Sequence, residues 1–220
     1  MGLSTYQLEA ICAGKVRSCT SDVPINGKKS WTTAFHKSPV TGPALFAQDK
    51  ITGDEQGDRR HHGGRDQAAL AYSLDHHPAW KEDYGIDEIP FGAFGENLCV
   101  RGATDSDVCV GDVWQIGNVR LVVTKPRQPC STFARCWRRP DLVERVIATR
   151  SGGWYLRILV AGSVEAPHAI ELIERPSPKW TIARLMEAYY ERKDDKQVAS
   201  ELAQLEALSM SWREAFAKRM

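Results

Sequence analysis

Short apolar runs separated by turn residues dominate the chain up to about residue 176, which predicts a β-rich region. Residues 113–116 and 119–123 flank Gly117-Asn118, a two-residue loop suited to a tight hairpin turn. A further strand is expected over residues 154–160, and after a glycine turn another extended stretch covers residues 169–173. Strands of this length between Gly, Pro and Asn turns predict a closed or nearly closed β-barrel.

Helical segments interrupt this β-rich region. One helix is expected near residues 75–83 and stops at Gly85, and another is expected near residues 141–149. The second would have Pro140 in its first turn and would end at Gly152-Gly153. The fold class predicted for this part of the chain is therefore mainly β, with peripheral helices.

The pattern changes after Pro178, because glycine is absent from there to the end and apolar residues recur at helical spacing. Three short helices are predicted, and residues 211–214 (Ser-Trp-Arg-Glu) form a capping-box pattern that opens the third. Such short helices bury little core alone, so we expect them to pack on the barrel or on a second subunit. We divide the chain into a barrel domain of residues 1–176 and an extension of residues 177–220. The apolar helical positions are Ile182, Leu185, Met186, Tyr189, Val198, Leu202, Leu205, Trp212 and Phe216.

The composition is that of a globular protein, with 220 residues of which 42% are hydrophobic and 26% are charged. The 29 basic and 28 acidic residues nearly balance, so the overall charge indicates neither a nucleic-acid nor a membrane partner. No run of 18 apolar residues could span a membrane, and the first residues lack the features of a secretion signal. Six cysteines without a CxxC pair fit a reducing compartment, so we expect a cytoplasmic protein.

Residues 125–130 (Lys-Pro-Arg-Gln-Pro-Cys) carry the strongest chemical signal in the chain. They join the end of a β-branched run to a helix that is expected to start near Ser131. Cys130 therefore lies at a fixed loop position close to two basic side chains, a setting that favours thiolate over thiol. A thiolate held in this way serves as a nucleophile or as a soft metal ligand, and the residues alone leave both roles open.

Three more loops hold more glycine and polar residues than a turn requires. Residues 53–66 place an imidazole beside a glycine pair, and residues 94–98 place a carboxylate and an amide in apolar surroundings. Residues 152–157 direct a phenol and a guanidinium to one face of a strand. With the cysteine loop they supply a full active-site inventory, whose convergence the residues alone leave open. The side chains concerned are His62, Glu96, Asn97, Tyr155 and Arg157.

Five short motifs follow one another in the order seen in a known protein family. They are His62-Gly-Gly, Gly95-Glu-Asn-Leu, Gly111-Asp112, Pro126-Arg-Gln-Pro-Cys130 and Gly153-Trp-Tyr-x-Arg157. In these motifs, residues 15–176 resemble the MOSC family, which is named after the C-terminal domain of molybdenum cofactor sulfurase. The tail from Trp180 resembles the three-helix extension of the bacterial branch linked to resistance to 6-N-hydroxylaminopurine.

The resemblance implies a MOSC-type β-barrel that binds the pterin-based molybdenum cofactor, with Cys130 as the protein ligand to molybdenum. A thiolate suits this role, since the pterin already gives the metal two soft dithiolene sulfurs. The phosphate of the cofactor calls for Arg or Lys donors. The cofactor-binding residues implied in this way are Lys37, Arg65, Arg127 and Arg157, together with Asn97 and Gln128.

The same resemblance implies that His62 and Glu96 act in catalysis beside the metal ligand, by holding a substrate or relaying a proton. One position departs from the family's His-Gly-Gly-x-x-Lys pattern, because Gln67 stands where the lysine is expected. Another cation must then neutralise the phosphate, and Arg65 is the nearest in the sequence.

The activity implied by the resemblance is that of an oxidoreductase that converts R–NH–OH to R–NH2 and water, with hydroxylated purine bases as the expected substrates. The chain shows no flavin or nicotinamide motif, so the electrons would come from a separate reductase. Two alternatives stay open: a carrier that holds the cofactor or relays sulfur without turnover, and a metal-free hydrolase built from Cys130, His62 and Glu96. A homodimer interface, a docking site for the electron donor and a lid are the roles open to the C-terminal helices.

Overall fold

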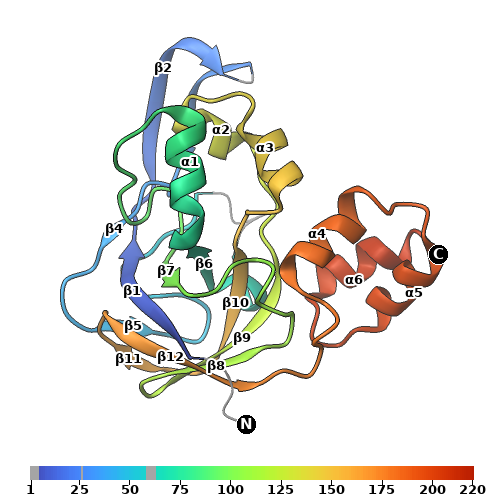
Figure 1. The fold of residues 1–220 in the computed structure, drawn as a ribbon. Coiled ribbons are helices and arrows are strands. Elements are labelled where there is room, and N and C mark those ends of the chain that lie inside the picture. Colours follow the sequence, from blue (N-terminus) through green and yellow to red (C-terminus); the bar gives the residue numbers. More distant parts are fainter. Residues whose placement is uncertain (1–4, 26, 58–62) are drawn as a thin grey trace.

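A closed ring of seven strands forms the body of the protein in the computed structural model, which describes residues 5–25, 27–57 and 63–220 (Figure 1). Each strand of the ring pairs with two neighbours, so the predicted barrel is confirmed. The pairs are antiparallel except for β6 and β7, which run parallel. In order around the barrel the strands are β12 (His168–Glu174), β8 (Val113–Ile116), β9 (Val119–Pro126), β10 (Trp154–Val160), β6 (Ala69–Ser73), β7 (Leu98–Arg101) and β1 (Thr5–Ala13).

The hairpin predicted around Gly117-Asn118 is confirmed by the pairing of β8 with β9. β10 has the predicted bounds, and β12 begins one residue earlier than expected. β9 continues beyond residue 123 to Pro126, because Pro126 lies opposite Trp154 of β10. This extra length carries the chain to Arg127, the next residue.

Alternation along the strands points every second side chain into the barrel. In β9, Val119 and Leu121 are fully buried, whereas Arg120 between them is exposed. Trp114 and Trp154 meet edge to face in the same core, with ring centroids 5.8 Å apart. Because side chains fill the barrel interior, we expect a ligand site to lie in the loops outside the barrel.

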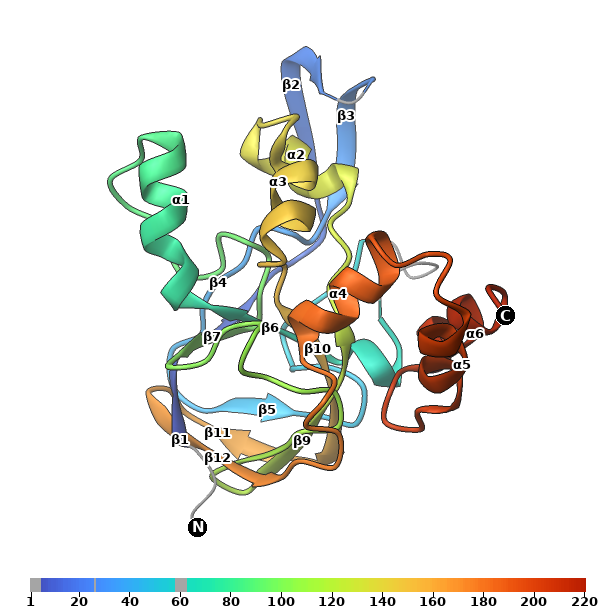
Figure 2. The same ribbon diagram turned by 45° about the vertical axis from the view of Figure 1, so that its right-hand side comes forward.

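The helices and the hairpin at one end of the barrel hold the loops with the predicted chemistry (Figures 1 and 2). α1 (His77–Tyr84) follows a short turn and ends, as predicted, at Gly85, which is in the left-handed conformation. α2 (Ser131–Trp137) begins directly after Cys130, as predicted. A hairpin formed by β2 and β3 projects beside α2. The remaining elements here are η2 (Leu74–His76), β2 (Arg17–Ile25) and β3 (Lys28–Thr33), whereas η1 (Arg65–Gln67) packs on β9 and β10.

α3 (Leu142–Thr149) agrees with the helix predicted near residues 141–149, but Arg150 and not Gly152-Gly153 ends it. Arg150 adopts the left-handed conformation, with φ 55°, and its N–H donates to the Ile147 carbonyl. Its guanidinium binds both carboxylate oxygens of Glu191 at 2.7 Å. Residues other than glycine rarely adopt this conformation, and the bidentate pair with Glu191 joins the end of α3 to the end of the first C-terminal helix.

The three C-terminal helices lie together on one side of the barrel (Figure 1), and their apolar faces join the core of the barrel. The capping box predicted at Ser211 is wrong, because Ser209 is the residue that precedes the last helix. The Ser209 N–H donates to the Thr124 carbonyl of β9 at 3.0 Å, and this anchor determines where the helix begins. The helices are α4 (Ile182–Tyr190), α5 (Lys196–Gln204) and α6 (Met210–Ala217).

Three short strands complete the described part of the chain. β4 pairs with β1, and β5 pairs with β11 at the opposite end of the barrel from α2 (Figure 1). They are β4 (Ser38–Pro39), β5 (Ala44–Phe46) and β11 (Gly162–Val164). Among the helices of the described residues, none has the length and apolar character that crossing a membrane requires. The predicted boundary between residues 176 and 177 stays a prediction.

Candidate functional site

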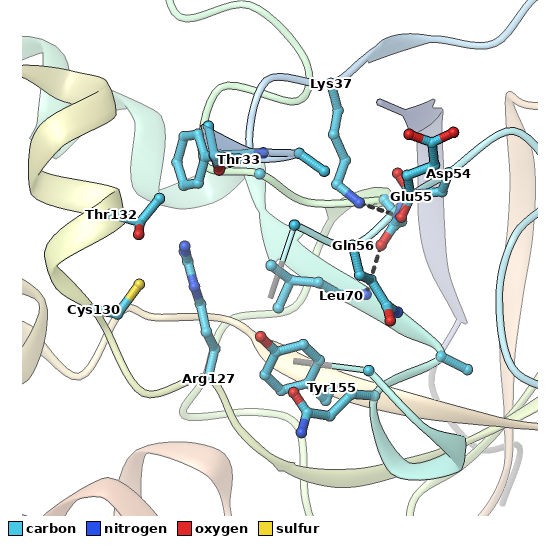
Figure 3. A pocket seen from close by; sticks show the side chains of 18 of the residues that line it. Thr33, Lys37, Asp54, Glu55, Gln56, Leu70, Arg127, Cys130, Thr132 and Tyr155 are labelled. Carbon is cyan, nitrogen blue, oxygen red and sulfur yellow. Dashed lines mark hydrogen bonds and ion pairs between the residues drawn. The ribbon is translucent and has the colours of Figure 1, made fainter. Parts of the chain in front are cut away.

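A pocket lies beside the loop that follows β9, and side chains from distant parts of the chain line it (Figure 3). Its enclosed volume is about 150 Å³. Small-molecule sites usually enclose about 300–1,000 Å³, so a larger ligand would extend beyond the enclosed part. The polar lining residues include Thr33, Lys37, Asp54, Glu55, Gln56, Gln67, Asn97, Arg127, Cys130, Thr132 and Tyr155.

The backbone holds Cys130 in an extended conformation, with φ −125°, at the position directly before α2. Its carbonyl accepts the Phe133 N–H at 3.0 Å, and at the other end of the loop the Arg127 N–H donates to the Gly153 carbonyl at 2.9 Å. The loop is thus tied to α2 and to the start of β10. The Cys130 side chain lines the pocket (Figure 3), where its sulfur can reach a ligand.

Arg127 places a buried guanidinium in the pocket. The residue is only 5% exposed, and its guanidinium lies over the rings of Phe133 and Phe35, 4.4 and 5.7 Å from their centroids. Nη1 is buried and has no hydrogen-bond partner among the described residues. Because a buried polar group without a partner is costly, this position is suited to an anionic ligand.

Lys37, by contrast, has its partner within the protein. Its Nζ lies 2.5 Å from Asp54 Oδ2, and both side chains are nearly buried. Burial lowers the pKa of Lys37, and the Asp54 carboxylate opposes this shift. The Gly14 N–H donates to the other Asp54 oxygen at 2.9 Å. The pair forms part of the pocket wall. Because Asp54 balances the charge of Lys37, this lysine would attract a phosphate only weakly.

Glu96 does not line the pocket. It is completely buried, the N–H groups of Gly92 and Phe94 donate to its two oxygens at 2.8 and 2.9 Å, and the Cys99 thiol donates at 3.4 Å. Burial raises the pKa of its carboxyl group, and the backbone hydrogen bonds act in the opposite direction. Glu96 therefore organises its own loop, and the fold does not bring it together with Cys130 in the pocket.

Asn97 lines the pocket but uses both ends of its amide to join strands. Its Oδ1 accepts the Leu70 N–H and its Nδ2 donates to the Cys12 carbonyl, each at 3.0 Å. Two residues earlier, Gly95 has φ 79°, and a Cβ there would lie 2.9 Å from the ring of Phe35. Only glycine allows this close approach of the pocket wall, which gives the Gly-Glu-Asn motif a structural purpose.

The other predicted cofactor residues lie outside the pocket lining. Arg157 binds Asp66 through Nε and Nη2 at 2.8 and 2.5 Å, and Arg65 is exposed on η1. Gln128 is half-buried beside Tyr190 of α4. His62 lies outside the described residues, so its predicted role stays a prediction. Within the described ranges no three His, Cys, Asp or Glu side chains are grouped to hold a metal ion.

Two further residues line the pocket: Tyr155, which the sequence places in the active-site inventory without assigning it a role, and Thr132, which no motif names. The alternation of β10 buries Trp154 in the barrel and turns Tyr155 outward to the pocket, a signal that the sequence contains. Burial raises the pKa of Tyr155 and the charge of Arg127 lowers it, so the phenol stays neutral at physiological pH. Thr132 has no comparable signal, because only the fold shows which residues surround it.

Comparison with known proteins agrees with this architecture. Residues 58–171 match the family model of the MOSC domain, and residues 180–220 match that of the YiiM-like, 3-alpha helix domain. The chain belongs to the MOSC family. The predicted membership is therefore confirmed, as is the three-helix extension of this MOSC protein.

Named relatives extend the comparison. Protein YiiM of Escherichia coli is 30% identical over 189 residues, which are 85% of this chain and 84% of that protein. A Gibberella moniliformis protein named Reductase is 33% identical over 177 residues, 79% of this chain, but the chain spans only 31% of its length. The crystal structure of YiiM from Geobacillus stearothermophilus superposes with a TM-score of 0.81 at 34% identity, covering 97% of this chain and 98% of that one. The MOSC protein thus shares its whole architecture with YiiM.

Proposed function

We propose that this MOSC protein is a molybdenum-cofactor-dependent oxidoreductase that reduces N-hydroxylated compounds, such as 6-N-hydroxylaminopurine, to the amine. MOSC domains are associated with the molybdenum cofactor in general, and a relative named Reductase supports a redox role. The observation that carries the proposal is the pocket itself, in which the Cys130 sulfur lies beside the guanidinium of Arg127 (Figure 3).

The pocket residues fit two chemically different parts of this cofactor. A thiolate at Cys130 would add a soft ligand to a metal that the dithiolene sulfurs already hold. Arg127 Nη1, buried and without a partner among the described residues, would donate to an anionic oxygen such as that of the phosphate. Bound there, the molybdenum centre would supply the two-electron chemistry.

The protein's own contribution is to bind, orient and exclude water. Phe35 and Phe133 cover the guanidinium of Arg127, and in such an environment its attraction for an anion is stronger than in water. The Tyr155 hydroxyl points toward Arg127 in Figure 3 and can donate a hydrogen bond to a substrate oxygen. Such a bond would favour the loss of the hydroxyl oxygen as water, in R–NH–OH + 2 e⁻ + 2 H⁺ → R–NH2 + H2O. The electrons would come from a separate reductase.

A metal-free cysteine hydrolase is less well supported. Such an enzyme needs a base next to the nucleophile and a group that orients the base. The carboxylate available for that task, Glu96, is bound by Gly92 and Phe94 outside the pocket lining. A cofactor carrier without turnover would use the same pocket, and the assay described next separates it from an enzyme.

Metal content and reductase activity test the proposed function. We expect protein purified from cofactor-competent cells to contain molybdenum and to reduce 6-N-hydroxylaminopurine with a chemical electron donor. Cys130→Ser should lose both properties, because a serine hydroxyl is a harder and less acidic ligand. Cys19→Ser, on the β2–β3 hairpin and not among the residues that line the pocket, is the matched control. Full activity with bound metal in Cys130→Ser would exclude the ligand role, and metal without any reduction would indicate a carrier.

A further inference from the structure

Arg135 lies one turn into α2 and holds the hydroxyl groups of the first two residues of this helix. Its Nη1 donates to Ser131 Oγ and its Nη2 donates to Thr132 Oγ1, each at 2.9 Å. The Arg135 side chain is buried, and its guanidinium lies over the Trp31 ring of β3, 5.8 Å from the centroid. Arg135 is therefore an internal clamp on the start of α2 rather than a surface charge.

The bond from Arg135 determines how Thr132 can act. A hydroxyl group has one proton and two lone pairs, so an oxygen that accepts a bond from Arg135 still has its own proton to donate. Accepting from a cation also polarises the hydroxyl group and strengthens it as a donor. Within residues 5–25, 27–57 and 63–220, Thr132 Oγ1 only accepts. Since Thr132 lines the pocket, its proton is available to a ligand there.

Thr132 and Arg127 offer their donors to the same part of the pocket. Figure 3 shows the end of Arg127 and the Thr132 hydroxyl group near the sulfur of Cys130. The ring of Phe133, the residue after Thr132, lies 4.4 Å from the Arg127 guanidinium and keeps the two donors close. Two carboxylates also line the pocket, and each has a lysine partner: Asp54 pairs with Lys37, and Glu55 pairs with Lys15. A buried guanidinium beside a hydroxyl donor suits a ligand with several anionic oxygens.

We propose that Arg127 Nη1 and Thr132 Oγ1 form an oxyanion subsite beside Cys130, and that Arg135 is its positioning residue. The ligand is a phosphate-like group, which the cofactor or an anionic substrate could bring. That choice of source rests on the proposed function, whereas the binding of an oxyanion does not.

Calorimetric titration of the metal-free, full-length protein with inorganic phosphate tests the subsite. Arg127→Met should weaken binding about tenfold or more, because a charged donor is lost while the apolar packing is kept. Thr132→Val, which replaces only the hydroxyl group, should weaken it about three- to tenfold. Arg120→Met, on the exposed face of β9, is the control and should bind phosphate as the wild type does. Unchanged affinity in Arg127→Met or Thr132→Val would overturn the subsite.

A double-mutant cycle tests whether Arg135 acts through Thr132. Arg135→Met should weaken phosphate binding about as much as Thr132→Val, and the double variant should bind no more weakly than Thr132→Val alone. Arg135→Lys should recover part of the affinity, because lysine can still donate to one of the two hydroxyl groups. Thermal unfolding of each variant reports the folded state separately. Losses that add in the double variant would overturn the positioning role.

Protein loaded with the cofactor distinguishes the two sources of the oxyanion. If the phosphate of the cofactor occupies the subsite, inorganic phosphate no longer binds to the loaded protein. If the subsite serves a separate anion, phosphate still binds there and Arg127→Met still weakens it. Should purified protein never carry molybdenum while phosphate binding still responds to the substitutions at Arg127 and Thr132, the proposed function fails and the subsite stands.

Discussion

Burial affects the ionisable side chains around the pocket in different ways. Lys37 and Asp54 are buried as a pair, and Glu96 is buried among backbone donors. Arg127 is buried with Nη1 unpartnered among the described residues. The first three side chains have their hydrogen-bond or ion-pair partners within the protein, whereas a ligand would supply the missing partner of Arg127 Nη1. We therefore expect Arg127 to be the charge through which the pocket binds its ligand.

Sequence motifs identify the polar residues of such a site but not the partners of those residues. Cys130, Arg127 and Asn97 were named from short motifs, and all three line the pocket. Arg157 comes from a motif as well, yet Asp66 binds it away from the pocket lining. That carboxylate is 91 residues away in the sequence, so only the tertiary structure shows the pairing.

His77 should make the stability of the protein depend on pH. Burial lowers its pKa from 6.5 to about 4, with the charge of Lys81 acting in the same direction. Between these pH values the unfolded chain binds a proton at His77 that the folded chain does not. The free energy of unfolding therefore rises as the pH rises from about 4 to 6.5, and this contribution of His77 is lost as the pH falls. Allowing for partial exposure, we expect a gain of about 2 kcal/mol across this window, measured by urea unfolding.

A phenylalanine at this position should remove the effect. His77→Phe has no proton to bind, and its ring can occupy the same place near Tyr72 and Phe94, so the pH profile should become flatter. His168→Gln, on β12, should keep the wild-type slope. If His77→Phe shows the wild-type slope as well, other groups cause the pH dependence.

At the scale of secondary-structure elements, ends that depend on local signals follow the sequence, and ends that depend on distant contacts do not. Gly85 ends α1 because its backbone adopts the left-handed conformation without strain. α3 also ends at Thr149, as expected, although Arg150 takes the left-handed position in which glycine was expected. The start of α6 instead depends on the bond from Ser209 to β9. No local pattern around residue 209 contains this partner.

Asp112 connects the end of β12 to the turn before β8. It is completely buried and accepts bonds from Arg175 Nε and Nη2 at 2.8 and 2.6 Å and from the Cys109 N–H at 2.9 Å. Asp112→Ala leaves the guanidinium and the N–H without this partner. We expect the free energy of unfolding to fall by about 3–5 kcal/mol, measured by urea unfolding.

The exposed pair of Lys15 and Glu55 provides the comparison for this buried pair. Lys15 Nζ lies 3.0 Å from Glu55 Oε1 at the surface. Exposed ion pairs of this kind contribute less than about 1 kcal/mol to the free energy of unfolding. Lys15→Ala should therefore leave the urea midpoint almost unchanged. If Asp112→Ala were no more destabilising than Lys15→Ala, the buried pair would not be what holds the end of β12.

At the scale of the whole molecule, the sequence predicts a barrel but not the order of its strands. For strands that are neighbours in the chain, such as β8 and β9, the tight turn between them predicts their pairing. The pairing of β1 with β12 closes the ring over more than 150 residues, and β6 and β7 lie parallel. Closure depends on the geometry of all seven strands together, and no short segment contains this information.

The C-terminal helices and the barrel share one hydrophobic core, so we expect them to unfold as one cooperative unit. Backbone bonds run from the Val110 N–H to the Trp180 carbonyl and from the Ile182 N–H to the Val108 carbonyl, at 3.0 and 2.8 Å. The apolar faces of α4, α5 and α6 belong to the same core as the barrel strands. A chain ending at Pro176 should therefore expose apolar surface, aggregate and unfold without a sharp transition, as dye binding and calorimetry would show.

A single substitution in the full-length chain tests the same shared core without removing any helix. Leu185 of α4 is completely buried, so Leu185→Ala should lower the free energy of unfolding by about 2–5 kcal/mol. Met210→Ala, at the exposed start of α6, should change it by less than about 0.5 kcal/mol. A monomeric, cooperatively unfolding barrel after truncation, with little effect of Leu185→Ala, would mean that the extension is not needed for folding. The helices would then serve only as a dimer interface, a docking site or a lid.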